Sequence, residues 1–208
     1  MNFETRYLVR WGIPGWIFII LLSLYFLIRD IESFTHSMPQ GNGSTIVATG
    51  AILAVIGIPI GYLFNQLHHT LTFVLTRKFH GYKGWDEYFS FEARFENYFF
   101  TYEVQRDNED SEQKTGIGEK ILERYKYLLS RIHEIGSICF AIIFSEVFLT
   151  YWETFIGGKI NLTIIIYHIV IICLLVLLLI DRCYFKRNLE VFVNYHSNIA
   201  GLKKYYRD

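Results

Sequence analysis

The chain contains little cysteine and little proline, and its positive and negative charges balance. Three of its 208 residues are cysteine and three are proline, while 20 Lys and Arg balance 20 Asp and Glu. Cys139, Cys173 and Cys183 lie in or beside apolar runs, where cysteine usually acts as a small hydrophobe, so their placement does not suggest a disulfide framework. The chain is instead rich in hydrophobic (52%) and aromatic (18%) residues. Because these are concentrated in blocks, the composition is that of a membrane protein rather than a soluble domain.

Motifs that carry chemistry are also lacking. Gly116-X-Gly118 followed by Lys120 does not have the spacing of a phosphate-binding loop. His68 and His69 are adjacent, so they point to different sides of a helix and do not form a metal pair. We therefore expect no enzyme activity, no metal site and no cofactor.

Four apolar runs approach or reach the roughly 20 residues that cross a hydrocarbon core about 30 Å thick. The fold class expected is an all-α membrane protein made of two hairpins. Residues 1–64 form the first hairpin, with spans at 11–28 and 46–64, and residues 135–181 form the second, with spans at 135–156 and 160–180. A cytoplasmic helical unit (65–134) lies between them, and a cytoplasmic tail (182–208) follows.

The positions of the cations predict the orientation. Two Lys or Arg precede the first span, ten lie between the second and third spans, and six follow the fourth. The positive-inside rule then puts both termini and the long middle segment in the cytoplasm. We expect a bacterial inner, or plasma, membrane.

Small residues and aromatic residues characterise the first hairpin. Gly57-X-X-X-Gly61, with Ala54 one turn earlier, forms a small-residue face that lets another backbone approach closely, within or between subunits. The run "RWGIPGW" (10–16) allows a kink or pre-helical turn, and its tryptophans are expected to anchor the helix at headgroup depth.

An acidic side chain lies inside the third span. In "FAIIFSEVFLTYWETF" (140–155), Glu146 lies near the middle, and the helical rise places it near the membrane midplane. His168 of the fourth span lies within a turn of the same depth. Glu146 should turn inward and meet His168, Tyr167 or Tyr151. As a single acid without a second carboxylate or basic partner, it favours a hydrogen bond that fixes helix register over a proton or ion pathway.

The middle unit is helical and aromatic. An apolar stripe from Ile117 to Ile132 predicts a helix that runs on into the third span. Before it, eleven of the 24 residues 79–102 are aromatic. We interpret this stripe as packing on the 117–133 helix, with the surplus forming an interface with other subunits or a cytosolic partner; a plain domain core is an equal alternative. The interface residues expected are Trp85, Tyr88, Phe89, Phe95, Tyr98, Phe99 and Tyr102.

The C-terminal tail combines apolar residues with cations. It is expected to extend the fourth helix beside the middle unit, and its cations suit the phosphates of membrane lipids better than nucleic acid. The lipid-contacting residues expected are Arg182, Lys186, Arg187, Lys203 and Lys204.

The architecture as a whole resembles the membrane components of bacterial antiviral systems, notably the KwaA subunits of Kiwa and the four-span accessory proteins of some type VI CRISPR loci. The likeness covers the whole chain but carries over no functional residue. It implies a homo-oligomer that detects an infection-linked disturbance and holds or releases a cytosolic effector.

Two functions from different classes follow. The first is a non-enzymatic sensor or scaffold that binds a cytosolic partner. The alternative is an ion channel or depolarising effector in which Glu146 lines the conduction path. Against the channel, no span is amphipathic enough to line a wide aqueous path.

Overall fold

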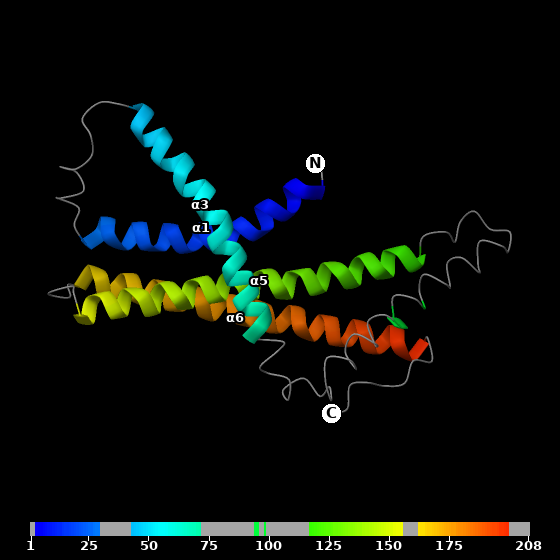
Figure 1. Cartoon of the computed structure of the whole chain (residues 1–208). Coiled ribbons are helices and arrows are strands. Elements are labelled where there is room, and N and C mark those ends of the chain that lie inside the picture. The colour runs from blue at the N-terminus through cyan, green and yellow to red at the C-terminus, as the bar shows by residue number, and fades with distance from the viewer. Residues whose placement is uncertain are drawn as a thin grey trace. The chain divides into compact units, whose positions relative to one another are not determined.

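In the part of the chain that the computed structural model describes there are four long helices, which Figure 1 labels. They are α1 (Phe3–Arg29), α3 (Gly43–His69), α5 (Ile117–Phe155) and α6 (Leu162–Ile199). The structure describes residues 3–29, 43–71, 94, 95, 98, 117–155 and 162–199. By length and composition, each of the four helices could cross a membrane. The prediction of an all-helical membrane protein with four candidate spans is thereby confirmed.

The helices of the second hairpin are longer than a membrane span. The prediction that the amphipathic stripe after Ile117 continues into the third span is confirmed, because α5 is unbroken over 39 residues. α6 likewise runs for 38 residues to Ile199, so most of the predicted tail extends the fourth helix. Both helices therefore extend well beyond the apolar runs.

The chain divides into two compact units. Unit 1 comprises Met1–His68 and His133–Asp181, and unit 2 comprises His69–Ile132 and Arg182–Asp208. The part of α6 from Arg182 onward therefore groups with the part of α5 before His133. α5 and α6 each contribute one part of their length to each unit.

The core of unit 1 is formed by three of its helices. Its buried members are Leu21 and Tyr25 of α1, Ile142 and Leu149 of α5, and Ile164, Tyr167 and Ile171 of α6. Large apolar side chains are instead exposed elsewhere on these helices, among them Val147, Leu177 and Ile180, each more than 60% exposed. Continuous exposed apolar surface of this kind is what lipid tails cover.

α3 contacts α1 through glycines. A Cβ atom added at Gly61 would collide with the carbonyl oxygen of Trp11, and one added at Gly15 would collide with the carbonyl oxygen of Gly57. The close approach predicted for Gly57 and Gly61 is thus found within the chain, where the partner is α1. Ala54 joins the same contact, because its carbonyl accepts a 2.8 Å hydrogen bond from the indole nitrogen of Trp16.

This contact changes the interpretation of "RWGIPGW". α1 is helical throughout and contains Pro14 within it, and its ribbon bends part-way along (Figure 1). A bend is expected there, because proline cannot donate to the carbonyl one turn earlier. Trp16 packs over Gly57 of α3, and its role as an interfacial anchor stays a prediction.

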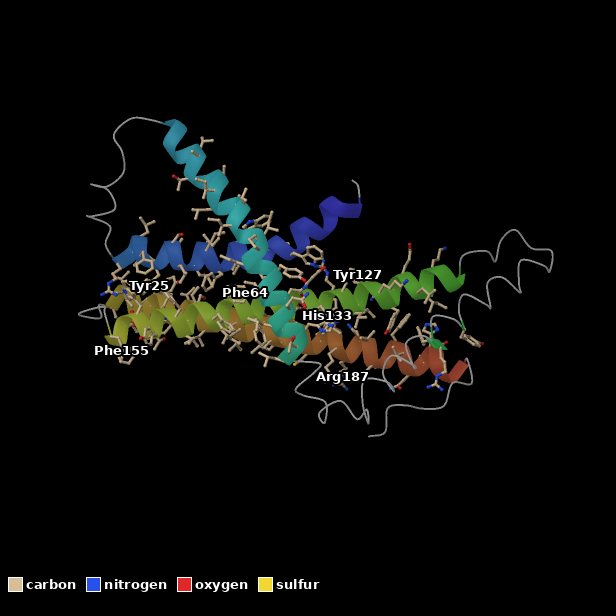
Figure 2. The ribbon with its side chains drawn as sticks, in the orientation of Figure 1. Tyr25, Phe64, Tyr127, His133, Phe155 and Arg187 are labelled. Atoms are coloured by element: carbon tan, nitrogen blue, oxygen red, sulfur yellow. The ribbon has the colours of Figure 1, made fainter. Side chains whose placement is uncertain are left out.

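Further along, α3 packs on α5. The ring of Phe64 lies 5.5 Å from that of Phe144 and 5.2 Å from that of Phe18, and Figure 2 shows Phe64 where α3 crosses the bundle. His68 is buried against Gly136 of α5. Residues 47–56 of α3 are exposed, so the helix is held by its C-terminal half.

Unit 2 has a small core of its own. Phe95 is fully buried, its ring centroid lies 5.1 Å from that of Tyr125 of α5, and Val193 of α6 completes the cluster. Tyr98 and partly buried residues of α5 and α6 pack against it: Ile121, Leu122, Leu129, Leu189 and Phe192.

Candidate functional site: a polar chain inside the membrane-spanning unit

Glu146 and His168 meet inside unit 1. The Nδ1 atom of His168 lies 2.6 Å from Oε2 of Glu146, and the two side chains are only 18% and 16% exposed. A separation this short is typical of a charge-assisted hydrogen bond. The contact follows from the similar depth of the two residues in antiparallel neighbouring helices.

Glu146 is not a single acid, so this part of the sequence interpretation is wrong. Glu153, two turns further along α5, is 10% exposed, and its Oε1 atom lies 3.4 Å from Nε2 of His168. The imidazole is therefore flanked by a carboxylate on each ring nitrogen. The signal was present in the sequence, because residues seven apart lie on the same face of a helix.

The chain of contacts continues to α1. The hydroxyl of Tyr25 donates to Oε1 of Glu153 at 2.8 Å and accepts from Nη1 of Arg29 at 2.9 Å. Figure 2 shows Tyr25 at the same end of the bundle as Phe155, where α5 ends. Neither Tyr25 nor Arg29 is predictable from the sequence, since no local pattern indicates which span lies next to the second hairpin.

We call Glu146, His168, Glu153, Tyr25 and Arg29 the polar chain. It crosses from α5 to α6, back to α5 and on to α1, so three of the four helices share it. Its formal charges are two carboxylates, one guanidinium and an imidazole. Such groups are costly beside lipid unless they are partnered, and here they are partnered mostly by one another. One atom is an exception: Oε1 of Glu146 is buried without a hydrogen-bond partner.

The other two residues proposed as partners of Glu146 lie elsewhere. Tyr167 is buried and donates to the backbone carbonyl of Leu21 at 2.8 Å, which fixes α6 to α1. Tyr151 is 58% exposed and its ring packs on Phe155, on the outside of the helix. Of the three candidates named from the sequence, the structure brings His168 alone to the carboxylate.

A second polar group lies nearer the other end of α5 within unit 1. Ser137 donates from its hydroxyl towards Oδ1 of Asn65 and the carbonyl of His133, each at 2.9 Å. The rings of His68 and His133 lie 6.1 Å apart. Between this group and the polar chain, α5 presents Cys139, Ala141 and Ile142 as buried apolar residues.

The predicted partner interface lies mostly outside the described residues. Trp85, Tyr88, Phe89, Phe99 and Tyr102 are not described. Phe95 is buried inside its own chain, and Tyr98 packs against the same core. The position of Phe95 matches the domain-core alternative, because a fully buried ring has no surface left for a partner, whereas Tyr98 is only partly buried.

The predicted lipid-contacting cations are divided in the same way. Lys203 and Lys204 lie outside the described residues, whereas Arg182, Lys186 and Arg187 lie on α6. Lys186 is 49% exposed and pairs with Glu190 one turn on, at 3.8 Å. Nearby in unit 2, the guanidinium groups of Arg124 and Arg131 lie 5.4 and 5.5 Å from the ring centre of Tyr127. Contact with phosphates stays a prediction for all five cations.

Comparison with known proteins adds no relative. No protein-family model, no curated protein and no solved structure matches the chain. Function must therefore be inferred from the residues themselves.

Proposed function

We propose that the protein is a non-enzymatic, oligomeric sensor and scaffold of the bacterial inner membrane that binds a cytosolic effector protein. The observation that carries this is the continuity of α5 and α6. Each helix supplies part of the polar chain in unit 1 and part of the Phe95 core in unit 2. A change at the polar chain therefore acts on helices that also build the second unit.

The direction of signalling follows from topology. With both termini and the middle segment in the cytoplasm, as the distribution of Lys and Arg favours, unit 2 is the cytoplasmic part and Arg29 lies towards the outer side. The polar chain then lies towards the outer half of the bilayer, and the segment before α5 is on the cytoplasmic side. A role in antiviral defence is supported by the resemblance of the architecture.

The proposal is tested by affinity purification of the full chain from gently solubilised native membranes. The mass of the oligomer is measured and the co-purifying proteins are identified. We expect a stoichiometric cytosolic partner that is lost from a Trp85→Ala, Phe89→Ala double variant. Phe95 is left unchanged in that variant, because its replacement would disturb the core of unit 2. Glu123→Gln, an exposed change on α5, is the control that should retain the partner.

A second candidate is a channel or depolarising effector, and the unpartnered Oε1 atom of Glu146 favours it. Such an oxygen is what a conducted cation would contact. The apolar stretch of α5 between the two polar groups of unit 1 opposes a route through a single copy, so conduction needs several copies. A pure oligomer without a partner, which conducts in liposomes and stops conducting on Glu146→Gln, would establish the channel.

A further inference from the structure

His168 has an acceptor on each side. Its Nδ1 atom lies 2.6 Å from a carboxylate oxygen of Glu146, and its Nε2 atom lies 3.4 Å from one of Glu153. A neutral imidazole carries a single N–H, and an ionised carboxylate is an acceptor without a proton to donate. If both carboxylates are ionised and the imidazole is neutral, one ring nitrogen has no hydrogen to donate. Its lone pair then faces the lone pair of a carboxylate oxygen, and that contact is repulsive. One further proton on these three residues makes both contacts favourable.

The charges around these three residues also favour one added proton. α1 contributes Arg29, which is cationic at any relevant pH, and Tyr25, whose hydroxyl joins Arg29 to Glu153. α6 contributes Tyr167, whose hydroxyl is directed to a backbone carbonyl instead. α3 packs elsewhere on the unit, through Gly57, Gly61 and Phe64. Counted over the five residues of the polar chain alone, two carboxylates, one guanidinium and one added proton sum to zero, and a smaller net charge is less costly inside a bilayer.

We propose that Glu146, His168 and Glu153 form a proton-binding site inside the membrane-spanning unit, with the hydrogen ion as its ligand. On binding, a hydronium ion transfers its proton to the three residues and leaves as water, and the charge of the polar chain rises from minus one to zero. The proton is held on His168 as imidazolium, or on Glu146 or Glu153 as the acid, and each arrangement satisfies the two contacts.

Loss of the proton weakens the contact between α5 and α6. One of the two N···O contacts then brings lone pairs together, and a net negative charge is left in a medium of low dielectric constant. The bound proton thus stabilises the contact between α5 and α6, the two helices that continue into unit 2. The idea that this proton is the stimulus of a sensor rests on the proposed function. The proton-binding site itself does not depend on that function.

The test uses the full chain with ¹⁵N-labelled histidine in lipid vesicles at about pH 8, where ordinary imidazole and carboxyl groups have both lost their protons. Nuclear magnetic resonance reports whether both ring nitrogens of His168 carry hydrogen, and His168→Gln identifies its signal. Infrared spectroscopy reports a protonated carboxyl group. We expect either an imidazolium at His168 or a protonated carboxyl band that disappears in Glu146→Gln.

In the Glu153→Gln variant the side-chain amide of the new glutamine can donate a hydrogen bond to Nε2 of His168. Both contacts of a neutral imidazole are then favourable without an added proton, so the imidazolium signal or the protonated-carboxyl band should be lost. Glu123→Gln, an exposed acid elsewhere on α5, should leave the signal unchanged. A neutral His168 together with no protonated carboxyl in the unmodified protein overturns the proposal, as does a signal that survives in Glu153→Gln. If the variants do not fold, the unmodified protein alone decides. Neither readout needs a partner protein, so failure here is distinct from failure of the partner purification.

Discussion

Adding one methyl group at Gly61 should force α1 and α3 apart. A Cβ atom there would overlap the carbonyl oxygen of Trp11 and lie 2.9 Å from the backbone nitrogen of Gly15, inside the 3.4 Å of ordinary contact. Both atoms belong to the backbone of α1, so neither can rotate away as a side chain would. Overpacking in a close-packed interior costs about 1–3 kcal/mol. We expect Gly61→Ala to lie at the upper end of that range.

Gly50 supplies the matched control, because it lies on the same helix and a Cβ atom added to it meets nothing within 4 Å. Gly50→Ala should be neutral or stabilise the protein by up to about 1 kcal/mol, since alanine favours helix more than glycine does. The assay is equilibrium unfolding in mixed detergent micelles, followed by tryptophan fluorescence, to which Trp16 contributes at this contact. If Gly61→Ala unfolds at the same denaturant concentration as Gly50→Ala, the glycine contact between α1 and α3 does not exist as described.

Three further variants test other contacts. Tyr25→Phe removes the hydroxyl that joins Glu153 to Arg29. It should destabilise unit 1 by about 1–3 kcal/mol in the same unfolding assay, because it loses a hydrogen bond to each of two charged groups; an unchanged midpoint would contradict this reasoning. Trp16→Phe loses the hydrogen bond to Ala54 and part of the ring that packs over Gly57, and it should cost about 0.5–3 kcal/mol in the same assay; an unchanged midpoint would show that Trp16 does not hold α3 to α1. Phe95→Ala should lower the stability of unit 2 by about 3–5 kcal/mol, which would be measured as faster amide hydrogen exchange in that unit. If the variant and the unmodified protein exchange at the same rate, the Phe95 ring is not part of the core.

The sequence predicts where the helices are better than it predicts which helices contact one another. Apolar runs of sufficient length specify the spans, and the stripe after Ile117 specifies the continuous helix, because both are properties of a single segment. The contact between Glu146 and His168 is predictable for a related reason. They lie on consecutive helices joined by a short connection, so helical rise alone brings them to similar depth.

Contacts between helices distant in sequence were not predictable in the same way. Nothing in the segment around Tyr25 or Arg29 indicates that α1 lies beside the end of α5. Gly57 and Gly61 indicate that a backbone approaches closely, but any helix with a small residue would satisfy them, and Gly15 is recognised as the partner only once the helices are placed. Glu153 was missed for a different reason, since it lies near the end of its span, where an acid is usually solvated.

The polar chain also bears on how the protein enters the bilayer during synthesis. An ionised side chain near the centre of a helix costs about 2.5–3.5 kcal/mol on transfer into lipid. α5 carries Glu146 and Glu153, and the imidazole that faces both lies on α6, beyond residues 156–161. A nascent α5 is therefore a poor candidate for release into the lipid by itself. It is best retained at the translocon until α6 has been made, so that the two helices enter the bilayer together as a hairpin.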